Sequence, residues 1–403
     1  MTEKKDFKVF LSLILWALIP SVYLIIRMNI VAVNNVDINI LGQMEWFDLI
    51  DEIIITTMTV PLYSILKPEK SSRERNGFAL IISFTVYLIF TLIISAKVSS
   101  ITEFMNAEFS ERYLFLQSFS MLIAYISSFT IILFVLNADY KTVCTLIISR
   151  VLMLSVFDYL LISKFSDIGA SYSEITVNSI LAIISMLLAF HNKYIGFGKC
   201  NLSWIKEWWH IGIFAGIQIF LDNFIYAIMI CKMVNSVSES GNYWVANNFI
   251  WGWLLVPVSC LAEIIKRNSL EKLNMKNTWR FALGIAGLWI VSMPGWHWFI
   301  EKIMACNPDV TLAIVWPLIP FYFTYIVSAL IDAWFISKGK TIYTTIISVF
   351  VNIVYYGILF ILFKKGTFES SMMFIILMFG FGMVVHLILS LIIYRYDVKK
   401  QTN

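Results

Sequence analysis

The chain has 403 residues, of which 59% are hydrophobic and 14% are charged, and its mean hydropathy is +0.80. Soluble domains carry about 25% charged residues, so this composition excludes the soluble classes and predicts an all-α polytopic membrane protein. The net charge of +4 indicates no partner by itself, and long unbroken apolar runs argue against a β-barrel, whose strands alternate.

Twelve apolar stretches are long enough to cross a bilayer, because about 20 helical residues span about 30 Å of hydrocarbon. The first stretch exceeds the core of a signal peptide and lacks a clear cleavage site, so we expect it to be a retained helix. The twelve expected spans cover residues 7–38, 45–66, 78–97, 113–136, 142–163, 171–190, 208–233, 242–264, 279–300, 311–336, 341–363 and 371–394.

Lys and Arg residues predict the orientation, because cytoplasmic segments carry an excess of them. With the N-terminus inside, most of these cations fall in segments expected to face the cytoplasm, including residues 4–8, 67–75, 193–206 and 266–280. We therefore expect a multi-pass protein of the cell (plasma or inner) membrane with both termini cytoplasmic.

Three short segments of the first half recur in order in the second half, at offsets of about 200 residues. The pairs are residues 60–66 with 256–261, 124–128 with 324–328, and 141–149 with 340–348. We expect a six-helix bundle over 1–190, a cytoplasmic linker over 191–207 and a second six-helix bundle over 208–403. Six spans per bundle keep both copies in one orientation, so a pseudo-two-fold axis along the membrane normal relates them. Such repeats place a substrate cleft between them near the midplane.

Span seven carries one ionisable residue near its middle, Asp222. A carboxylate at bilayer depth costs about 2.5–3.5 kcal/mol on insertion scales, so it should face a polar cavity or a partner. Intramembrane acids mark ion or substrate pathways by default, which makes Asp222 a candidate for cation coupling. The alternative is an acid that caps a neighbouring polar group inside the bundle.

Four further acids lie within or beside the spans: Asp37, Asp158, Glu174 and Asp332. Grouped carboxylates in a low-dielectric site take up H⁺ or Na⁺, because two unscreened negative charges repel strongly there. We expect Asp37, Asp158 and Glu174 to converge in the first bundle. Asp332 should join Asp222 in the second. For Asp37 and Glu174, interfacial acids that simply face water are the alternative.

Other polar residues and prolines complete the predicted site. The expected lining of the substrate cleft is Asp222, Gln218, Asn223, Tyr226, Asn247 and Asn248. Prolines within helices bend them, which suits a hinge or gate but also a plain kink. The expected hinges are Pro20, Pro61 and Pro257. At the outer start of span two we interpret four acids as a solvated vestibule face: Glu45, Asp48, Asp51 and Glu52.

Sequence signatures of catalysis are not found. The 4 histidines lie on different segments, without HExxH or a GxSxG elbow, and the 5 cysteines show no metal-binding or CxxC spacing. No Walker lysine follows a Gly-rich run, so an ion gradient and not ATP should supply the energy. We expect no enzyme, no nucleic-acid partner and no cofactor or metal apart from H⁺ or Na⁺ as the coupling ion.

Scattered motifs follow a known pattern. Pro20 precedes Val36-Asp37 and Gly42; Asp158 precedes Ile162 by four residues, and Gly169-Ala170 follow; an acid occupies the seventh span; and Ile331-Asp332-Ala333 lies in the tenth. In these residues the chain resembles the multidrug and toxic-compound extrusion (MATE) family, within the multidrug/oligosaccharidyl-lipid/polysaccharide flippase superfamily. It departs from the family pattern at Leu154, Glu174 and Phe214.

The resemblance implies cation-coupled export through a V-shaped pair of bundles, with a cation site at Asp37 and Asp158 or at Asp222 and Asp332. We predict a monomeric secondary active transporter, surrounded by membrane lipid, that exports an amphipathic, cationic organic small molecule by H⁺ or Na⁺ antiport through alternating access. The alternative within transport is a flippase for a lipid-linked sugar or polysaccharide precursor, which would favour cationic groups in the cleft. The alternatives outside transport are a membrane enzyme and a receptor-like scaffold.

Overall fold

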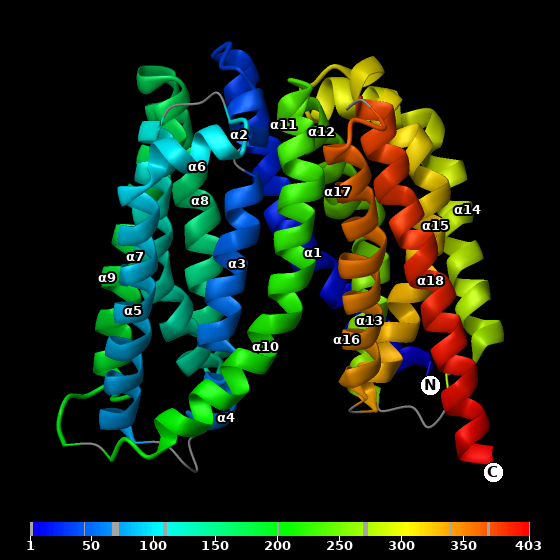
Figure 1. Cartoon of the computed structure of the whole chain (residues 1–403). Coiled ribbons are helices and arrows are strands. Elements are labelled where there is room, and N and C mark those ends of the chain that lie inside the picture. The colour runs from blue at the N-terminus through cyan, green and yellow to red at the C-terminus, as the bar shows by residue number, and fades with distance from the viewer. Residues whose placement is uncertain are drawn as a thin grey trace. The chain divides into compact units, whose positions relative to one another are not determined.

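The computed structural model describes residues 3–43, 45–66, 72–107, 111–199, 201–268, 273–338, 340–368 and 371–402. Across these ranges the chain forms helices and no strand. The helices build two compact units (Figure 1), which we call unit 1 (residues 1–29 and 228–403) and unit 2 (residues 30–227). Each unit is described separately below.

These units differ from the expected bundles in the allocation of two helices. The first 29 residues pack with the second half of the chain, and the seventh expected span packs largely with the first half. Division into two six-helix bundles at residues 191–207, and the two-fold axis between them, stay predictions.

Unit 2 contains the helices from the second to the seventh expected span. They are α2 (Asn39–Gln43), α3 (Glu45–Thr59), α4 (Leu62–Ile65), α5 (Arg73–Ala96), α6 (Val98–Phe104), α7 (Glu111–Leu136), α8 (Tyr140–Phe165), α9 (Asp167–His191) and α10 (Trp204–Tyr226).

Unit 1 contains most of α1 (Glu3–Val33) and the remaining helices, several of which include a π-helical turn (η). They are η1 (Ala227–Cys231), α11 (Lys232–Ser236), α12 (Ser240–Phe249), η2 (Ile250–Leu254), α13 (Val256–Asn268), α14 (Met275–Trp298), η3 (Phe299–Ile303), α15 (Pro308–Ser337), α16 (Thr341–Val349), η4 (Phe350–Tyr355), α17 (Tyr356–Lys364) and α18 (Met372–Thr402). Both ends of the chain lie at the same end of this unit (Figure 1).

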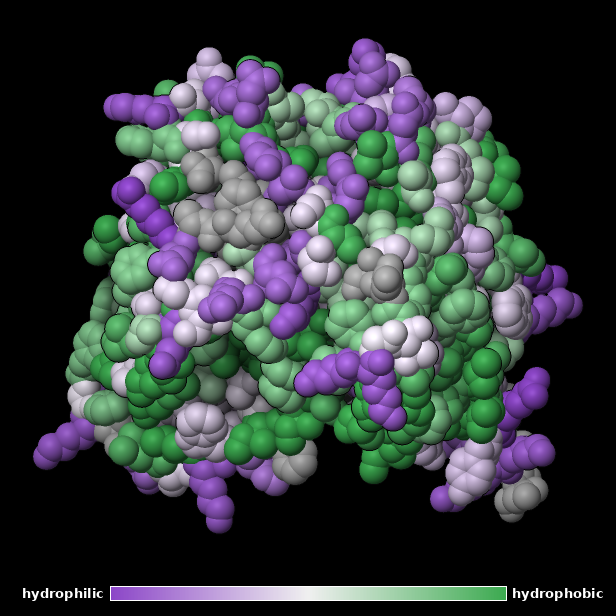
Figure 2. Space-filling model, turned by 45° about the horizontal axis from the view of Figure 1, so that its top comes forward, coloured by the Kyte–Doolittle hydropathy of each residue, from purple (hydrophilic) through white to green (hydrophobic). Residues whose placement is uncertain are grey.

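Many of these helices are suited to a lipid environment. Nine described helices are long and apolar enough to cross a membrane, or ten if the bent pair Ser240–Leu254 and Val256–Lys266 counts as one span. Apolar side chains such as Leu187 and Val291 are 64% and 80% exposed, which favours contact with lipid over water. Figure 2 shows hydrophobic side chains along the helix flanks and much of the hydrophilic surface near the helix ends. The chain is a multi-pass membrane protein, and the count of twelve spans stays a prediction.

Side-chain caps explain where several helices begin. The Ser72 hydroxyl accepts from the Arg75 amide at 3.2 Å, and the Asp139 carboxylate accepts from the Thr142 amide at 3.2 Å. Asn307 caps α15 in the same way, and Pro308 occupies the first helical position, where its missing N–H costs nothing.

The core of unit 2 is built by α5, α7, α8 and α9. Tyr87 on α5 stacks on Tyr125 of α7 with ring centroids 5.3 Å apart, and both rings are almost fully buried. Helix α9 packs along both α7 and α8. Asp158 on α8 therefore lies in the interior of a helical bundle, and Glu174 on α9 is half-buried there.

Helices α3 and α10 meet in unit 2 through small residues. A Cβ on Gly216 would lie 2.2 Å from Thr57 Oγ1, and a Cβ on Gly212 would lie 2.6 Å from the Thr57 carbonyl oxygen. Only glycine allows this approach, as in the small-xxx-small contacts of membrane helices. One turn earlier on α10, the Trp208 indole N–H donates to the Met58 carbonyl at 3.0 Å.

The core of unit 1 centres on α15, which packs against α13, α14 and α18. Trp334 on α15 is fully buried and meets the Tyr394 ring of α18 edge-on at 5.1 Å. Near the same end, Lys340 Nζ pairs with the buried Asp397 carboxylate at 2.5 and 2.7 Å. The long helix α18 is thereby fixed to the start of α16.

The first helix is held in unit 1 by two side chains that bind carbonyl groups. The Ser21 hydroxyl donates to the Gly252 carbonyl at 2.8 Å, and the Asn29 amide donates to the Ile303 carbonyl at 2.7 Å. Pro20 lies inside α1, which continues as a helix on both sides of it.

The chain bends by 51° at Leu255, between the segments Ser240–Leu254 and Val256–Lys266 and two residues before the predicted hinge Pro257. Pro257 has no N–H to give to the preceding turn, so carbonyl groups there need other donors. Ser21 satisfies the Gly252 carbonyl, and the Trp289 indole N–H satisfies the Leu254 carbonyl at 3.2 Å. Irregular backbone at membrane depth is tolerated where neighbours replace the lost bonds in this way.

Candidate functional site

The most buried of the predicted acids, Asp158, lies in the hairpin formed by α8 and α9. A single residue, Ser166, connects these helices, and a Cβ on Gly169 would lie 2.4 Å from the Leu161 carbonyl oxygen. The two backbones are thus in close contact near the turn. Asp158 and Ser173 each lie about one helical turn further from this contact, on opposite sides of the hairpin, so they share one level. Both residues are 0% exposed.

Polar side chains continue from this level along the contact between α7 and α9. The Gln117 amide donates to the Glu174 carboxylate at 2.6 Å, and the Asn178 amide donates to the Ser120 hydroxyl at 3.0 Å. The hydroxyl of Ser173 is buried without a hydrogen-bond partner among the described residues. We call Gln117, Ser120, Asp158, Ser173, Glu174 and Asn178 the unit 2 polar cluster.

The structure places Asp158 and Glu174 on adjacent helices of one hairpin, and their grouping as a cation site stays a prediction. Asp37 does not lie in a comparable environment. It is exposed, four residues beyond the end of α1, and its carboxylate accepts from the Asn39 amide at 2.9 Å in the turn before α2. In this structure Asp37 therefore stabilises a surface turn.

A second polar group lies in unit 1 between α15 and α18. His386 Nε2 is 2.7 Å from Asp332 Oδ2, and the Ser390 hydroxyl donates to Asp332 Oδ1 at 3.4 Å. The side chains of Asp332 and His386 are 21% and 30% exposed. Both carboxylate oxygens thus have partners, and the group is partly open to the surroundings. Tyr325 lies two turns before Asp332 on the same face of α15.

Asp222, the predicted partner of Asp332, is half-buried on α10 and belongs to unit 2, whereas Asp332 belongs to unit 1. The structure thus does not group them in one unit. The next residue, Asn223, binds helix α3: its amide donates to the Leu49 carbonyl at 2.9 Å and to the Glu52 carboxylate at 2.8 Å.

The other residues predicted to line a cleft divide between the units. Tyr226 is half-buried in unit 2, and Asn247 is half-buried in unit 1. The side chain of Gln218 lies outside the described part of the structure. Asn248 lines a small pocket of about 180 Å³ within unit 1. The remaining lining consists of Ser21, Leu24, Ile25, Met28, Trp253 and Met304.

The predicted vestibule acids differ from one another. Asp48 and Glu52 are exposed and Glu45 is half-buried, but Asp51 is only 6% exposed. The interpretation of Asp51 as a solvated residue was therefore wrong. The predicted hinge Pro61 is buried at the break between α3 and α4, and Pro20 is exposed in α1.

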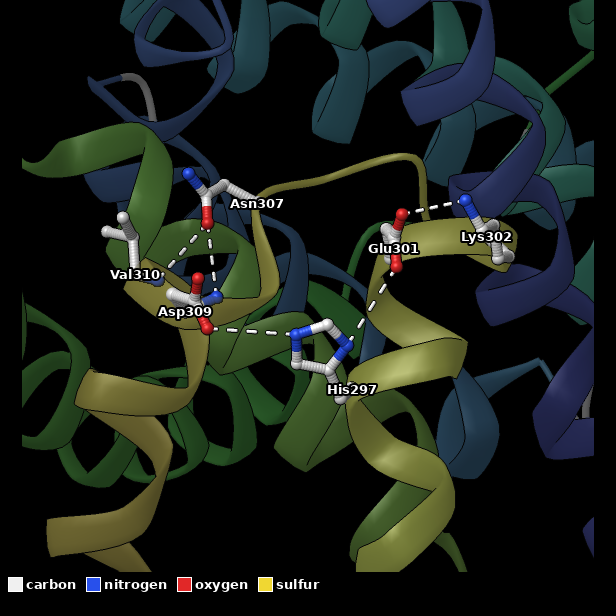
Figure 3. A network of polar contacts seen from close by, with 6 residues as sticks. All are labelled: His297, Glu301, Lys302, Asn307, Asp309 and Val310. Atoms are coloured by element: carbon white, nitrogen blue, oxygen red, sulfur yellow. Dashed lines mark hydrogen bonds and ion pairs between the residues drawn. The ribbon is translucent and has the colours of Figure 1, made fainter.

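A third polar network joins the ends of α14 and α15 (Figure 3). His297 lies between two carboxylates, 3.8 Å from Glu301 and 3.7 Å from Asp309. Lys302 pairs with Glu301 at 2.7 Å. These side chains are largely exposed, so water screens their charges and the network adds little to stability.

Sequence reasoning missed His386 and the polar residues Gln117, Ser120 and Asn178 as members of these groups. A signal was present for His386, because an ionisable residue inside an apolar span marks a functional position by default. For the amides and hydroxyls no sequence signal separates a bundle-facing position from a lipid-facing one. Among the described residues, no group of three or more His, Cys, Asp or Glu side chains is arranged to hold a metal ion.

No protein-family model matches the chain, and no curated protein matches it in sequence. Solved structures, in contrast, match along nearly its whole length. An inward-facing multidrug resistance MATE family transporter of the MOP superfamily has a TM-score of 0.74 at 14% identity, over 97% of this chain and 98% of that chain.

Two further transporters support the same assignment of fold. The MATE multidrug transporter DinF-BH, in a ligand complex, has a TM-score of 0.68 at 15% identity, over 97% of this chain and 95% of that chain. A mutant of the Vibrio cholerae MATE transporter VcmN has a TM-score of 0.65 at 14% identity, over 98% and 99%. The chain has the fold of MATE transporters, which confirms the resemblance predicted from its motifs.

Proposed function

We propose that the chain is a MATE-type secondary active transporter that exports an amphipathic organic cation in exchange for H⁺ or Na⁺ by alternating access. The observation that carries this proposal is the likeness to MATE transporter structures over 97% of the chain. We further propose that it works as a monomer in the cell membrane with both termini in the cytoplasm. A fold by itself does not define an activity, so the argument depends on the acids described above.

In unit 2 we assign cation coupling to Asp158 together with Glu174. Asp158 is fully buried within membrane-spanning helices, where a carboxylate costs about 2.5–3.5 kcal/mol on insertion scales. Binding H⁺ or Na⁺ removes that cost. The nearby hydroxyl and amide oxygens of Ser173, Ser120 and Gln117 are hard ligands of the kind that small alkali cations prefer.

In unit 1 we assign the corresponding role to Asp332, with His386 as its partner. A carboxylate and an imidazole 2.7 Å apart can hold or release a proton between them with little movement. Asp222 and Asp37 are the other proposed coupling acids, and the substrate is proposed to contact Asp222, Asn223, Tyr226, Asn247 and Asn248. Occupancy of a coupling site drives transport only if the two conformations differ in affinity for the ion.

Reconstituted vesicles with an imposed pH or Na⁺ gradient test the proposal, with a fluorescent organic cation as the probe. The wild-type chain should move the probe against its gradient. Asp158→Asn and Asp332→Asn should each slow this movement by more than about tenfold, equivalent to more than about 1.4 kcal/mol. Asp309→Asn is the matched control, because its carboxylate is 89% exposed at a helix end.

Insertion and folding should be measured in parallel by size-exclusion chromatography of each variant. Equal probe movement in the wild type and both buried-acid variants would refute coupling through these residues. If neither gradient moves the probe and a fluorescent lipid-linked sugar crosses the bilayer instead, the chain is a flippase.

A further inference from the structure

Asp51 on α3 is a buried acid that the proposed transport cycle does not use. Phe47 lies one turn before it and Met58 two turns after it, so the three residues share one face of the helix. Phe47 is 1% exposed, Met58 is 3% exposed and Asp51 is 6% exposed. The carboxyl group is therefore set in an apolar stripe of the interior of unit 2.

The Asp51 carboxyl group has no compensating donor on one of its oxygens. Its Oδ1 atom is buried, and no described residue forms a hydrogen bond to it. Glu52 presents the opposite situation on the next residue: it is exposed to solvent, and its carboxylate accepts from the Asn223 amide at 2.8 Å. Adjacent carboxyl groups thus occupy contrasting environments, and burial without a donor favours the neutral form of Asp51.

Charged groups around α3 do not offset the burial of Asp51. Among the described residues the charge that acts on Asp51 is that of Glu52, which is negative and opposes a second negative charge. Helix α2, which packs on α3, carries no titratable side chain. The titratable residues of the other helices packed closely on α3 are Tyr63 on α4, Glu111, Arg112, Tyr113 and Tyr125 on α7, and Lys206, Glu207, His210, Asp222 and Tyr226 on α10.

We infer that Asp51 is a proton-binding residue, which carries a proton in this conformation and releases it when a change in the packing of α3 admits water to the carboxyl group. An ionised carboxylate without a partner is far more costly to bury than a neutral carboxyl group. The chain therefore binds one proton more in this conformation than in a conformation with Asp51 hydrated. The inference goes beyond the proposed function, since it holds whether or not the chain exports a solute.

The packing of α3 on α10 holds α3 in this conformation. Their contact depends on Gly212 and Gly216 against Thr57, and on the two bonds from Asn223 to α3. These contacts lie on the opposite face of α3 from Phe47, Asp51 and Met58, so they hold the helix in place while the proton is bound.

Infrared difference spectroscopy of the full chain in lipid nanodiscs tests the inference directly. A protonated carboxyl group gives a C=O stretching band that shifts in D₂O, separate from the bands of ionised carboxylates. The wild type should show one such band that Asp51→Asn lacks. Asp48→Asn, one turn away on the exposed side of α3, is the matched control and should retain it.

Asp51→Glu keeps an acid at the position, so it should retain a band at a shifted frequency and shows that any loss in Asp51→Asn is not misfolding. Identical spectra for the wild type and Asp51→Asn would overturn the inference.

A second readout is thermal stability. The unfolded chain ionises Asp51 and loses a proton, so the wild type should lose stability as the pH rises from about 4 to about 7, more than Asp51→Asn does. Neither readout depends on transport, so failure of export leaves the test intact.

Discussion

His386 on α18 and Asp332 on α15 are paired across unit 1, with 2.7 Å between the imidazole Nε2 and the carboxylate Oδ2. Their positions are 54 residues apart in the chain, and Ser390 adds a second bond to the same carboxylate. The pair is only partly exposed, in contrast to His297, which is 54% exposed between two distant carboxylates. The two His–carboxylate groups contain the same residue types and differ in how far their side chains are buried.

A double-mutant cycle should measure the strength of the Asp332–His386 pair. Asp332→Asn and His386→Gln should each lower the free energy of unfolding by about 1–3 kcal/mol, because each leaves a partly buried partner poorly satisfied. The double variant should lose less than the sum, with a coupling energy of about 1–2 kcal/mol. His297→Gln is the control and should change stability by less than about 0.5 kcal/mol. Strict additivity at Asp332 and His386 would contradict the pairing.

The glycine contact between α3 and α10 makes a sharper prediction. Gly216→Ala places a methyl group against the Thr57 side chain, and Gly212→Ala places one against the Thr57 backbone. Both should destabilise the chain by about 1–3 kcal/mol or more, through overpacking. Chemical denaturation in mixed micelles would measure this loss.

Thr57→Ala distinguishes the two glycine variants. It removes the Oγ1 atom that a Cβ on Gly216 would meet at 2.2 Å, so it should restore most of the stability of Gly216→Ala. It leaves the carbonyl oxygen that faces Gly212 in place, so Gly212→Ala should stay destabilised. Equal rescue of both variants would show that the helices separate instead of clashing at these points.

Removing the side-chain donors that bind the carbonyl groups at the bend before Pro257 should lower the free energy of unfolding. Ser21→Ala leaves the Gly252 carbonyl without its donor, and Trp289→Phe does the same for the Leu254 carbonyl. Each unsatisfied buried group should cost about 1–3 kcal/mol. Ser155→Ala on α8 is a useful control, since its hydroxyl donates within its own helix to the Val151 carbonyl at 2.8 Å. The melting temperature of each purified variant checks this order.

Cys306, in the loop between η3 and α15, should be an unreactive thiol at neutral pH. Burial raises the pKa of its thiol to about 11 from an ordinary value of 9.0, and the thiol donates to the Met304 carbonyl at 3.3 Å. The thiolate is the reactive form, and at pH 8 it should make up about a thousandth of the population. In a variant that retains only Cys306, the alkylation rate should rise about tenfold for each pH unit up to about pH 11. A rate that levels off near pH 9 would contradict the effect of burial.

The sequence predicts the apolar helices well, because hydrocarbon thickness and backbone hydrogen bonding leave few alternatives for such a composition. Local chain geometry places Pro257 two residues after a 51° bend, and it places Asp158 and Glu174 on adjacent helices of one hairpin. The contact of Gly212 and Gly216 with Thr57 was not predicted and emerges only from the packing of α3 on α10.

Features that depend on long-range packing were not predictable. Asp48, Asp51 and Glu52 have similar chemistry within one turn of helix, and only the packing of α3 buries one of them and exposes the others. Asp332 on α15 pairs with His386 on α18, and nothing in the apolar sequences of these two helices indicates which of their residues lie opposite each other. Helix α1 binds the second half of the chain through the carbonyl groups of Gly252 and Ile303. Backbone carbonyls are present at every residue, so the sequence does not indicate which of them will accept these bonds.

The one-residue connection at Ser166, with φ of 56°, has a consequence for biosynthesis. Helices α8 and α9 leave the ribosome within a few seconds of each other, at about 5–20 residues per second. Because the turn is so short, we expect the two helices to enter the bilayer together as a helical hairpin. Asp158 then enters the bilayer already shielded by Ser173 and its neighbours, so lengthening this turn should trap newly made chains before insertion is complete.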